Sequence, residues 1–491
     1  MKLPSLFSLS LSAVALASLG GCGGGHNDSP IAVSVIGRPE DLSGPLVYDA
    51  ATAYQIRLAA TAQGLVAYNA TGDIVPALAQ RWIVVDGGLS YIFRLRRARW
   101  ANGARVDAGE VKRLLERRLR AMERMDPYGA LSSVSEVLAM TNDVLEIRLK
   151  TPRPSFLGAM AQPLMGIAMP TGGTGPYRVE RIDRGRGDLW LKPAQVDSGV
   201  DEESGPRGSD RRLLRTERSA RAVVRFTRGA TDLVLGGTLA DLPYLALADV
   251  RQDAVRFDPV LGLFGLALSR STPMFADAHV REALTMALDR DALVAGIDGA
   301  RWKATATLMV QPLNLPHAPT QPSWASTSLE ERRALASGTI TRWRGQHGGK
   351  PVALSLWLPE GPGMKRLFRL LQGQWRSIGV DLRPVRAGAA ADLTLIDEVA
   401  PYDSAAWYLS RISCARGVHC DARAEALLRQ SVTVPTMEER LVLLGRAEPL
   451  VAAHDGFIPL ATPVRWSLVD NRLDGVALSV RGFHNLRWLM R

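Results

Sequence analysis

The chain has 491 residues, of which 46% are hydrophobic and 22% are charged, and its formal net charge is +11. This composition is ordinary for a globular protein and excludes a chain that is disordered throughout. The length is sufficient for two or three domains of about 100–200 residues each.

The N-terminus has the layout of a bacterial export signal: a basic start, an apolar run and then small residues before Cys22. The apolar run is shorter than the ~20 residues that a membrane-spanning helix needs. Leu19-Gly20-Gly21-Cys22 also resembles the lipobox of bacterial lipoproteins, in which the cysteine is diacylated and becomes the first mature residue. We therefore predict a signal peptide over 1–21, a lipid anchor at Cys22 and a flexible tether over 22–30. An ordinary cleaved signal with an unmodified cysteine is the alternative.

Short runs of apolar or alternating residues, separated by turns, predict β-strands along the chain. In SYIFRLR (90–96), Tyr91, Phe93 and Leu95 alternate with three residues of the opposite face, which is the period of a half-buried strand. Further strands are expected at IAVSVIG (31–37), LEIRLK (145–150) and DLTLID (392–397).

Apolar residues at helical spacing predict helices between these strands. Asp107 is expected to be the N-cap of one helix, with Glu110 as its capping-box partner, and Thr436 and Glu439 have the same relation further on. The mixture of strands and helices indicates an α/β or α+β fold. Other helices are expected near 156–166, at FADAHVREALTMALDRDALV (275–294) and in MKRLFRLLQGQWRSIGV (364–380).

The basic residues are spread along the whole chain, with one dense run at RLRRARWANGARVDAGEVKRLLERRLR (94–120). A nucleic-acid-binding protein would concentrate this charge on one element with interleaved aromatic residues, so no nucleic-acid partner is expected. We interpret the surplus as a solvated face near anionic lipid, and a role in binding anionic ligands is the alternative.

Two cysteines remain, Cys414 and Cys420, with ARGVH between them. In an oxidising exported compartment the expected state is a disulfide, and its short loop would contribute about 2 kcal/mol. A metal site that uses His419 with both cysteines is an alternative, but the sequence shows no second cluster to complete four ligands. Two free thiols are the third alternative.

The sequence contains no complete catalytic motif. The seven histidines show no HExxH spacing, no GxSxG elbow occurs, and GQHGGKP (345–351) lacks the spacing and the hydroxyl of a phosphate-binding loop. Asp397 and Glu398 are adjacent, so on a strand they would point to opposite faces and form a poor acid–base pair. We therefore expect no enzyme, no metal and no cofactor.

A series of residues that match the pattern of one known protein family, in the same order along the chain, begins in the stretch QGLVAYNATGDIVPALAQRWIVVDGGLSYIFRLRRARWANGARVDAGEV (63–111). In order along the chain they include Tyr68, Pro76, Trp82, Phe93, Gly103, the GTGPY turn at 173–177, VREA at 280–283, Asp289-Arg290 and IPL at 458–460. Together these residues resemble the bacterial extracellular solute-binding proteins of family 5, which include the dipeptide-, oligopeptide- and nickel-binding proteins of ABC importers.

This resemblance implies a two-lobed periplasmic-binding-protein fold of the α/β class, with hinge-connected mixed sheets and an extra inserted domain. It further implies a monomer that captures a peptide or similar small solute between its lobes and delivers it to an ABC permease in the membrane. The expected domains are a first lobe of 31–62, 170–258 and 471–491, an inserted domain of 63–169 and a second lobe of 259–470.

Peptide-binding members of the family place an aspartate just before an aromatic-rich helix, where the carboxylate meets the α-amino group of the peptide. The aligned stretch here is IDEVAPYDSAAWYL (396–409), in which Pro401 takes the place of that aspartate. The resemblance implies that the ligand contacts come from Tyr402, Asp403, Trp407, Glu398 and Asp397. Arg411 and Arg416 are further candidates for a ligand carboxylate.

Pro401 also leaves other functions open. A metal chelate or an oligosaccharide is the alternative ligand for the same fold. An exported hydrolase would need a nucleophile and a base that converge in the cleft. A scaffold that binds only protein partners would have a cleft too small or too filled for a solute.

Overall fold

The protein is described here by a computed structural model that covers residues 29–43, 51–183, 185–194, 210–269, 271–298 and 302–491. The predicted signal peptide, Cys22 and nearly all of the predicted tether therefore lie outside the described residues. Within the described ranges, no helix is both long enough and apolar enough to cross a membrane.

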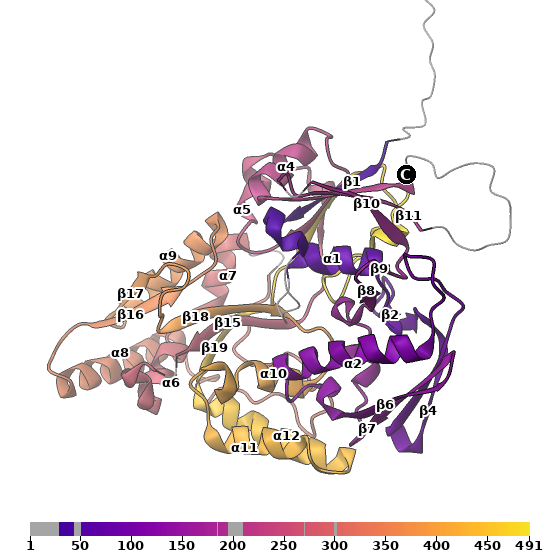
Figure 1. The fold of residues 1–491 in the computed structure, drawn as a ribbon. Coiled ribbons are helices and arrows are strands. Elements are labelled where there is room, and N and C mark those ends of the chain that lie inside the picture. The colour runs from indigo at the N-terminus through magenta and orange to yellow at the C-terminus, as the bar shows by residue number, and fades with distance from the viewer. Residues whose placement is uncertain (1–28, 44–50, 184, 195–209, 270, 299–301) are drawn as a thin grey trace, which may run out of the picture.

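The first lobe contains a seven-stranded mixed sheet (Figure 1). In sheet order its strands are β10 (Tyr177–Asp183), β11 (Asp188–Pro193), β12 (Arg212–Glu217), β1 (Ile31–Ile36), β13 (Leu233–Gly237), β20 (Trp466–Val469) and β14 (Val255–Phe257). β1 pairs in parallel with both β12 and β13, and the other neighbours are antiparallel.

Helices cover both faces of this sheet. Successive side chains of β1 point to opposite faces and therefore pack in different apolar clusters. Val33 and Val35 share a cluster with Ile56 of α1 (Thr52–Thr61). Ile36 packs against the cluster that contains Val223 of α4 (Ser219–Thr227). A short helix, α5 (Pro243–Leu247), follows β13.

The inserted domain is a separate antiparallel sheet with one long helix across it (Figure 1). Val111 and Leu115 of the helix pack on Phe93 and Ile147 of the sheet. The sheet order is β4 (Ala79–Val85), β5 (Ser90–Leu95), β7 (Val144–Leu149) and β6 (Val134–Thr141), and the helix is α2 (Ala108–Met125). Smaller elements nearby are β2 (Val66–Tyr68), β3 (Ile74–Pro76), α3 (Phe156–Met160), β8 (Ala168–Met169) and β9 (Gly172–Gly173).

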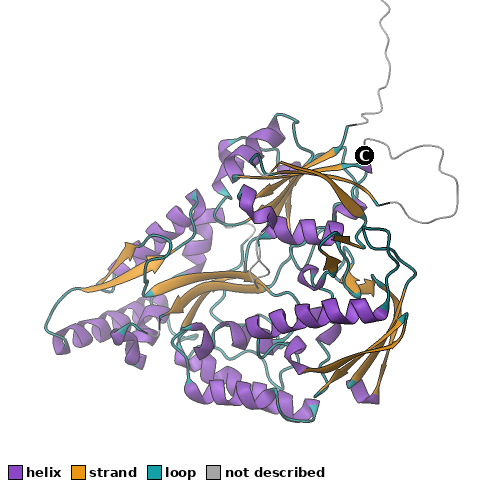
Figure 2. Cartoon of the chain, viewed as in Figure 1, coloured by secondary structure: helices purple, strands orange, loops and turns teal. Residues whose placement is uncertain are grey.

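The second lobe contains a five-stranded mixed sheet flanked by helices (Figure 2). In sheet order its strands are β17 (Val380–Pro384), β16 (Val352–Trp357), β18 (Leu393–Val399), β15 (Gly262–Leu268) and β19 (Phe457–Ala461). Its helices are α6 (Ala278–Met286), α7 (Arg290–Asp298), α8 (Leu329–Gln346), α9 (Pro362–Arg376), α10 (Ala405–Arg411), α11 (Ala422–Ser431) and α12 (Met437–His454).

Two of the expected helices are interrupted. The single helix expected over 275–294 is two helices, α6 and α7, because Asp289 accepts a hydrogen bond from the backbone N–H of Ala292 at 2.9 Å and starts a new helix. The apolar helix expected near 156–166 ends at Met160, and a 3₁₀ turn begins at Pro163, which cannot donate a helical hydrogen bond.

One boundary also differs from the expected domain division. The sequence assigned 259–470 to the second lobe, but β20 (466–469) lies in the first sheet, between β13 and β14. The indole of Trp466 lies directly against Gly237 of β13, where a Cβ atom would be 2.2 Å from the ring. The chain therefore returns to the first lobe before residue 470.

The inserted domain is one of the places where the two lobes contact each other. One apolar cluster extends from Leu115 in the inserted domain to Trp407 and Leu428 in the second lobe. Side chains also form hydrogen bonds across this boundary. For example, Arg153 Nη2 donates a hydrogen bond to the carbonyl oxygen of Val432 at 3.4 Å. In this structure the lobes therefore share a packed boundary along α10 to α12.

Candidate functional site

The five residues expected to contact ligand all lie on β18, on the loop after it or in α10. The loop begins where the backbone N–H of Ala400 donates to the carbonyl of Leu261 at 2.8 Å. Tyr68 of the inserted domain reaches this loop, and its hydroxyl lies 2.9 Å from the carbonyl oxygen of Gly158 and 3.2 Å from that of Pro401. The loop is therefore placed where the two lobes meet.

Tyr402 and Trp407 lie inside the protein. Tyr402 is 3% exposed, and its hydroxyl accepts a hydrogen bond from the backbone N–H of Ala130 at 3.4 Å. Trp407 is fully buried, and its ring meets that of Tyr408 edge to face at 4.8 Å. In this arrangement of the lobes, both side chains contact protein and neither is open to a solute.

Asp397 and Glu398 point in different directions, as expected of neighbours on a strand, and each contacts an arginine. Asp397 Oδ1 accepts a hydrogen bond from Arg465 Nη1 at 2.8 Å. Glu398 forms an ion pair with Arg411, a buried residue of α10. A charge that is buried without a partner is costly. The two arginines are the partners of these carboxylates, so both carboxylates have a structural role in the boundary.

Asp403 is the one expected ligand residue whose side chain is largely open to solvent, at 58% exposed. Arg481 holds it with two hydrogen bonds, from Nη1 at 3.1 Å and from Nη2 at 2.9 Å, which is the bidentate geometry that arginine favours. The same guanidinium lies over the ring of Tyr68, 5.6 Å from its centroid. Burial raises the pKa of Tyr68 to about 12, so its hydroxyl stays protonated.

Tyr68, Asp403 and Arg481 therefore form one cluster, here named the Asp403 cluster. Its members come from the inserted domain, the second lobe and the C-terminal segment. Tyr68 carried a sequence signal, because it is one of the family-like positions. Arg481 carried none, because it lies 78 residues from its partner and follows no motif.

A second polar group is buried at the boundary between the inserted domain and α10. Asp126 is 6% exposed and lies beside Ser410, Arg411 and Tyr402. Burial raises the pKa of Asp126 to about 6, although all three neighbours favour its charged form. This carboxyl is therefore poised to change its charge between acidic and neutral pH.

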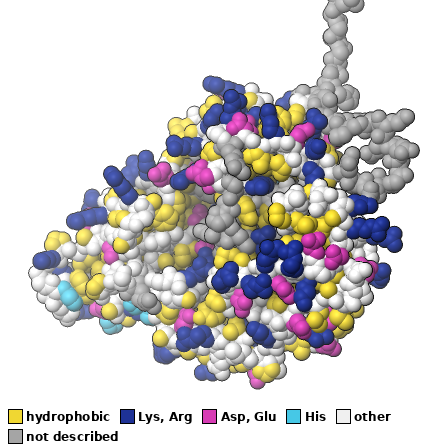
Figure 3. Space-filling view, viewed as in Figure 1, with side chains coloured by type: hydrophobic (Ala, Val, Ile, Leu, Met, Phe, Trp, Pro, Cys, Tyr) yellow, Lys and Arg dark blue, Asp and Glu magenta, His cyan; other side chains and the backbone are white. Residues whose placement is uncertain are grey.

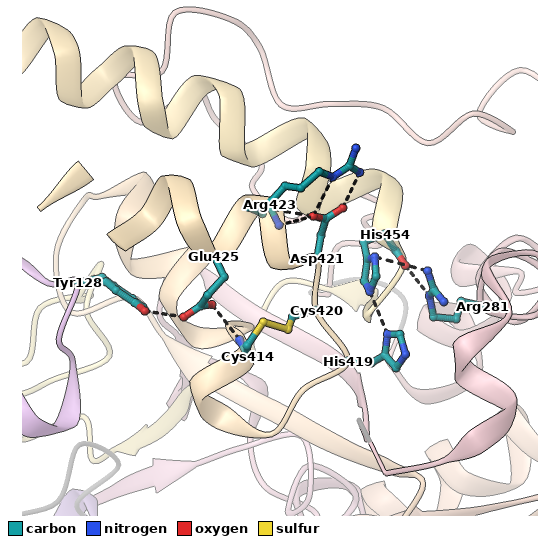
Figure 4. Close-up of a disulfide and its surroundings, with 10 residues drawn as sticks. Tyr128, Arg281, Cys414, His419, Cys420, Asp421, Arg423, Glu425 and His454 are labelled. Carbon is teal, nitrogen blue, oxygen red and sulfur yellow. Dashed lines mark hydrogen bonds and ion pairs between the residues drawn. A yellow bond between two sulfur atoms is a disulfide. The ribbon is translucent and has the colours of Figure 1, made fainter. Parts of the chain in front are cut away.

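A disulfide joins Cys414 and Cys420, whose Cα atoms lie 5.2 Å apart (Figure 4). Next to it, Glu425 accepts a hydrogen bond from the backbone N–H of Cys414 at 3.0 Å and another from the hydroxyl of Tyr128 in the inserted domain. The disulfide thus holds a loop that contacts both lobes. Because both sulfur atoms are bonded to each other, they are not free thiolates for the alternative metal site with His419.

His419 instead pairs with another histidine. Its Nδ1 lies 2.9 Å from Nε2 of His454, and Arg281 lies on the far side of His454 (Figure 4). Burial lowers the pKa of His454 to about 4, and the charge of Arg281 acts in the same direction. Both rings are thus neutral at neutral pH, and one donates to the other. Within the described residues, no group of three or more metal-ligating side chains comes together.

Arg411 and Arg416, the other candidates for a ligand carboxylate, also contact protein. Arg411 binds Glu398, as described above. Arg416 Nη2 donates to the carbonyl of Met125 at 2.8 Å and so connects the disulfide loop to the end of α2. Both arginines therefore contribute to the boundary between the lobes.

Two curated relatives are similar to this chain over most of its length. The first is the "Probable ABC transporter periplasmic-binding protein SapA" of Escherichia coli, at 23% identity over 84% of this chain and 83% of the relative. The second is the "Periplasmic oligopeptide-binding protein OppA" of the same organism, at 22% identity over 84% of this chain and 83% of the relative.

Solved structures share the two-lobed fold and confirm it for this chain. The Haemophilus influenzae OppA complex with RPPGFSPFR has a TM-score of 0.76 at 15% identity and covers 94% of this chain and 99% of its own. The Escherichia coli murein tripeptide binding protein MppA has a TM-score of 0.77 at 19% identity, with 94% and 98% covered. NikA from Brucella suis in complex with Fe(III)-EDTA has a TM-score of 0.72 at 18% identity, with 94% and 99% covered.

The unliganded open form of MppA fits less well, with a TM-score of 0.64 at 18% identity over 94% of this chain and 97% of its own. Residues 73–403 match the family described as "Bacterial extracellular solute-binding proteins, family 5 Middle". The chain belongs to the bacterial extracellular solute-binding proteins of family 5.

Proposed function

We propose that this protein is the lipid-anchored, solute-binding subunit of an ABC importer, and that it captures a peptide or a similar small solute between its lobes. The family match over 73–403 carries the proposal. A protein of this kind works by binding alone, because a solute that contacts both lobes shifts the population toward the closed arrangement. It needs no reactive group of its own.

A peptide is the ligand that the relatives support best. SapA and OppA are named for an ABC transporter and for oligopeptide binding, and the OppA structure contains a nine-residue peptide. We propose that Asp403 contacts the α-amino group of the ligand, two positions after Pro401. Its carboxylate is exposed, and Arg481 holds it in a fixed direction.

The role of Asp403 is tested with one tripeptide in two forms, with a free and with an acetylated N-terminus. Titration calorimetry should show that the wild-type protein binds the free form roughly tenfold more tightly, because a hydrogen bond to a charged group contributes about 1.5–3 kcal/mol. Asp403→Asn should abolish this preference, since acetylation then removes no charged partner. Arg481→Gln should increase the preference, because it frees the carboxylate from its internal partner.

Asp381→Asn is the matched control, since Asp381 is also exposed and also paired with an arginine, Arg383, but lies on β17. This control should keep the wild-type preference for the free amino group. A preference that survives in Asp403→Asn would contradict the proposed contact. The comparison is between two ligands of one variant, so a general loss of stability does not imitate the result.

A scaffold that binds only protein partners is the second candidate function. One observation favours it: Tyr402 is buried in an apolar cluster that both lobes share. The two functions differ in a thermal-shift screen with tripeptides and with Fe(III) and Ni(II) chelates. Stabilisation by a peptide supports the proposal, stabilisation only by a chelate supports the alternative ligand, and no stabilisation supports the scaffold.

The lipid anchor at Cys22 is a separate part of the proposal and lies outside the described residues. Wild-type protein expressed in a bacterium should fractionate with membranes, and Cys22→Ala should be recovered in the soluble fraction. Mass spectrometry of the N-terminal peptide should show a diacylglyceryl group on Cys22. An unmodified cysteine in a cleaved N-terminal peptide would contradict the anchor.

A further inference from the structure

An arginine-lined cleft lies on the first lobe, away from the Asp403 cluster. It has a volume of about 800 Å³ and is formed where β1 and β12 end side by side. The two strands run in parallel with Ile36 opposite Glu217, so the residues that follow them emerge at the same edge of the sheet. Gly185 and Arg186, which precede β11, and the start of α4 complete the walls.

Six arginines line this cleft, against three carboxylates. The arginines are Arg38, Arg186, Arg215, Arg218, Arg221 and Arg225, and the carboxylates are Glu40, Asp188 and Glu217. The lining therefore carries a surplus of three positive charges. Figure 3 shows Lys and Arg side chains gathered over the part of the surface around α4.

The carboxylates fix the inner arginines in place. Glu217 is buried and accepts two hydrogen bonds from Arg225 Nε, at 3.1 and 3.2 Å, and one from the hydroxyl of Ser34 at 2.6 Å. Asp188 pairs with Arg215 at 3.3 Å. Both of these guanidinium groups are mostly buried, so they are oriented by the protein before any ligand arrives.

The outer arginines are less constrained. The guanidinium of Arg38 pairs with Glu40 at 4.0 Å, with both side chains exposed, and the backbone N–H of Arg38 donates to Asp41 Oδ2 at 2.6 Å. Arg221 is 72% exposed and reaches Glu217 at 3.4 Å. No carboxylate within the described ranges pairs with Arg218, which precedes α4. The cleft thus combines an inner wall of arginines that are paired with carboxylates and an exposed basic rim that is only partly neutralised, since Arg186 pairs with Asp183 at 3.8 Å.

We propose that this cleft binds a phosphate-bearing ligand. Planar guanidinium groups bind phosphate oxygens in pairs, and a surplus of several charges favours a multiply charged anion over a single carboxylate. The volume falls within the ~300–1,000 Å³ typical of small-molecule sites, so it accommodates more than one phosphate group. The ligand source is either a free organic phosphate or a lipid headgroup, which present the same chemistry.

The test uses the full chain with Cys22→Ala, so that no acyl group binds vesicles by itself. Pyrophosphate is titrated into this protein and into two further variants by calorimetry. Arg38→Gln with Arg218→Gln removes two rim charges from the cleft. Arg342→Gln with Arg344→Gln is the matched control, because it removes the same charge from exposed positions on α8.

Pyrophosphate should bind the parent protein, and the cleft variant should bind it at least roughly tenfold more weakly, since each lost guanidinium removes a charge-assisted hydrogen bond. The control variant should bind it as the parent does. Equal weakening in both variants, or no binding by the parent, would overturn the proposal. Thermal unfolding without ligand verifies that the variants are folded.

Vesicles of phosphatidylcholine with and without phosphatidic acid distinguish the two sources. Flotation with phosphatidic acid that is lost in the cleft variant assigns the site to a lipid headgroup, and binding of pyrophosphate alone assigns it to a soluble phosphate. Both results support a phosphate site. Preferential binding of a polyglutamate peptide, weakened only in the cleft variant, would overturn it and assign the cleft to an acidic protein segment. A result of this kind leaves the tripeptide assays at Asp403 unaffected.

Discussion

Several carboxylates at the boundary between the lobes differ in how their charge is balanced. Asp397 and Glu398 each face an arginine, as does Asp403 on the surface. Asp126 also lies near an arginine, Arg411, but its burial outweighs that attraction and raises its pKa to about 6. The charge of its carboxyl therefore changes between acidic and neutral pH.

Asp126 is expected to make stability depend on pH. The folded carboxyl releases its proton near pH 6 and the unfolded one near its ordinary value of 3.8, so the folded chain holds an extra proton between these values. Stability therefore falls as the pH rises through this window, by about 3 kcal/mol for this group. Asp126→Asn removes the titration.

The measurement is urea unfolding of the wild-type protein and the variant at several pH values. The difference between their free energies of unfolding should shift in favour of the variant as the pH rises from about 4 to about 7. Other titrating groups cancel in this difference. A difference that stays constant with pH would show that Asp126 does not titrate in the folded protein within this window.

The sequence predicted the contacts of single residues well only where both partners lie close together in the sequence. Asp107 caps α2 by accepting from the N–H of Glu110, and Thr436 forms a full capping box with Glu439, because these contacts span three residues. The partner of Asp403 was not predictable, because Arg481 reaches it through the fold. The burial of Tyr402 was not predictable either, because residues of the inserted domain cover it.

At the scale of elements, the four strands that the sequence predicted end within one or two residues of their expected ends, since alternation and turns are read locally. Two helix breaks were missed, and at one of them a long-range contact adds to the local cap formed by Asp289. Gln374 of α9 binds both the N–H and the carbonyl of Asp289, at 2.7 and 3.0 Å, and thereby holds the junction of α6 and α7. Apolar periodicity continues through this junction, so the sequence pattern alone does not reveal it.

The start of α9 packs against the first lobe with no room for a side chain. A Cβ atom on Gly363 would lie 1.8 Å from the carbonyl oxygen of Leu239, a backbone atom of the segment after β13. Gly363→Ala should therefore lower the free energy of unfolding by about 1–3 kcal/mol, because the helix must move away. Chemical denaturation of the purified variant measures this change.

Gly373→Ala, nearly three turns further along the same helix, is the control. Nothing lies within 4 Å of a Cβ atom there, so alanine should raise the stability by roughly 0.5–1 kcal/mol through its better helix propensity. Equal effects of the two substitutions would contradict the close contact between α9 and the first lobe.

For the whole molecule, the family resemblance predicted the two lobes and the inserted domain, because its matching positions run in order along the chain. It did not predict how closely the lobes meet. Phe93 and Trp407 belong to one apolar cluster, and Tyr128 in one lobe bonds Glu425 in the other. These contacts join the two lobes, so the proposed capture of a solute between them requires the lobes to separate first.

The most direct test of this account is mass spectrometry of the natively purified protein, followed by release and identification of any bound small molecule. The account predicts one solute per chain, chemically unchanged after release, with lower occupancy in Asp403→Asn than in the control Asp381→Asn. Protein that carries no solute and takes up none from a peptide mixture, or that returns a cleaved product, would contradict capture by binding alone.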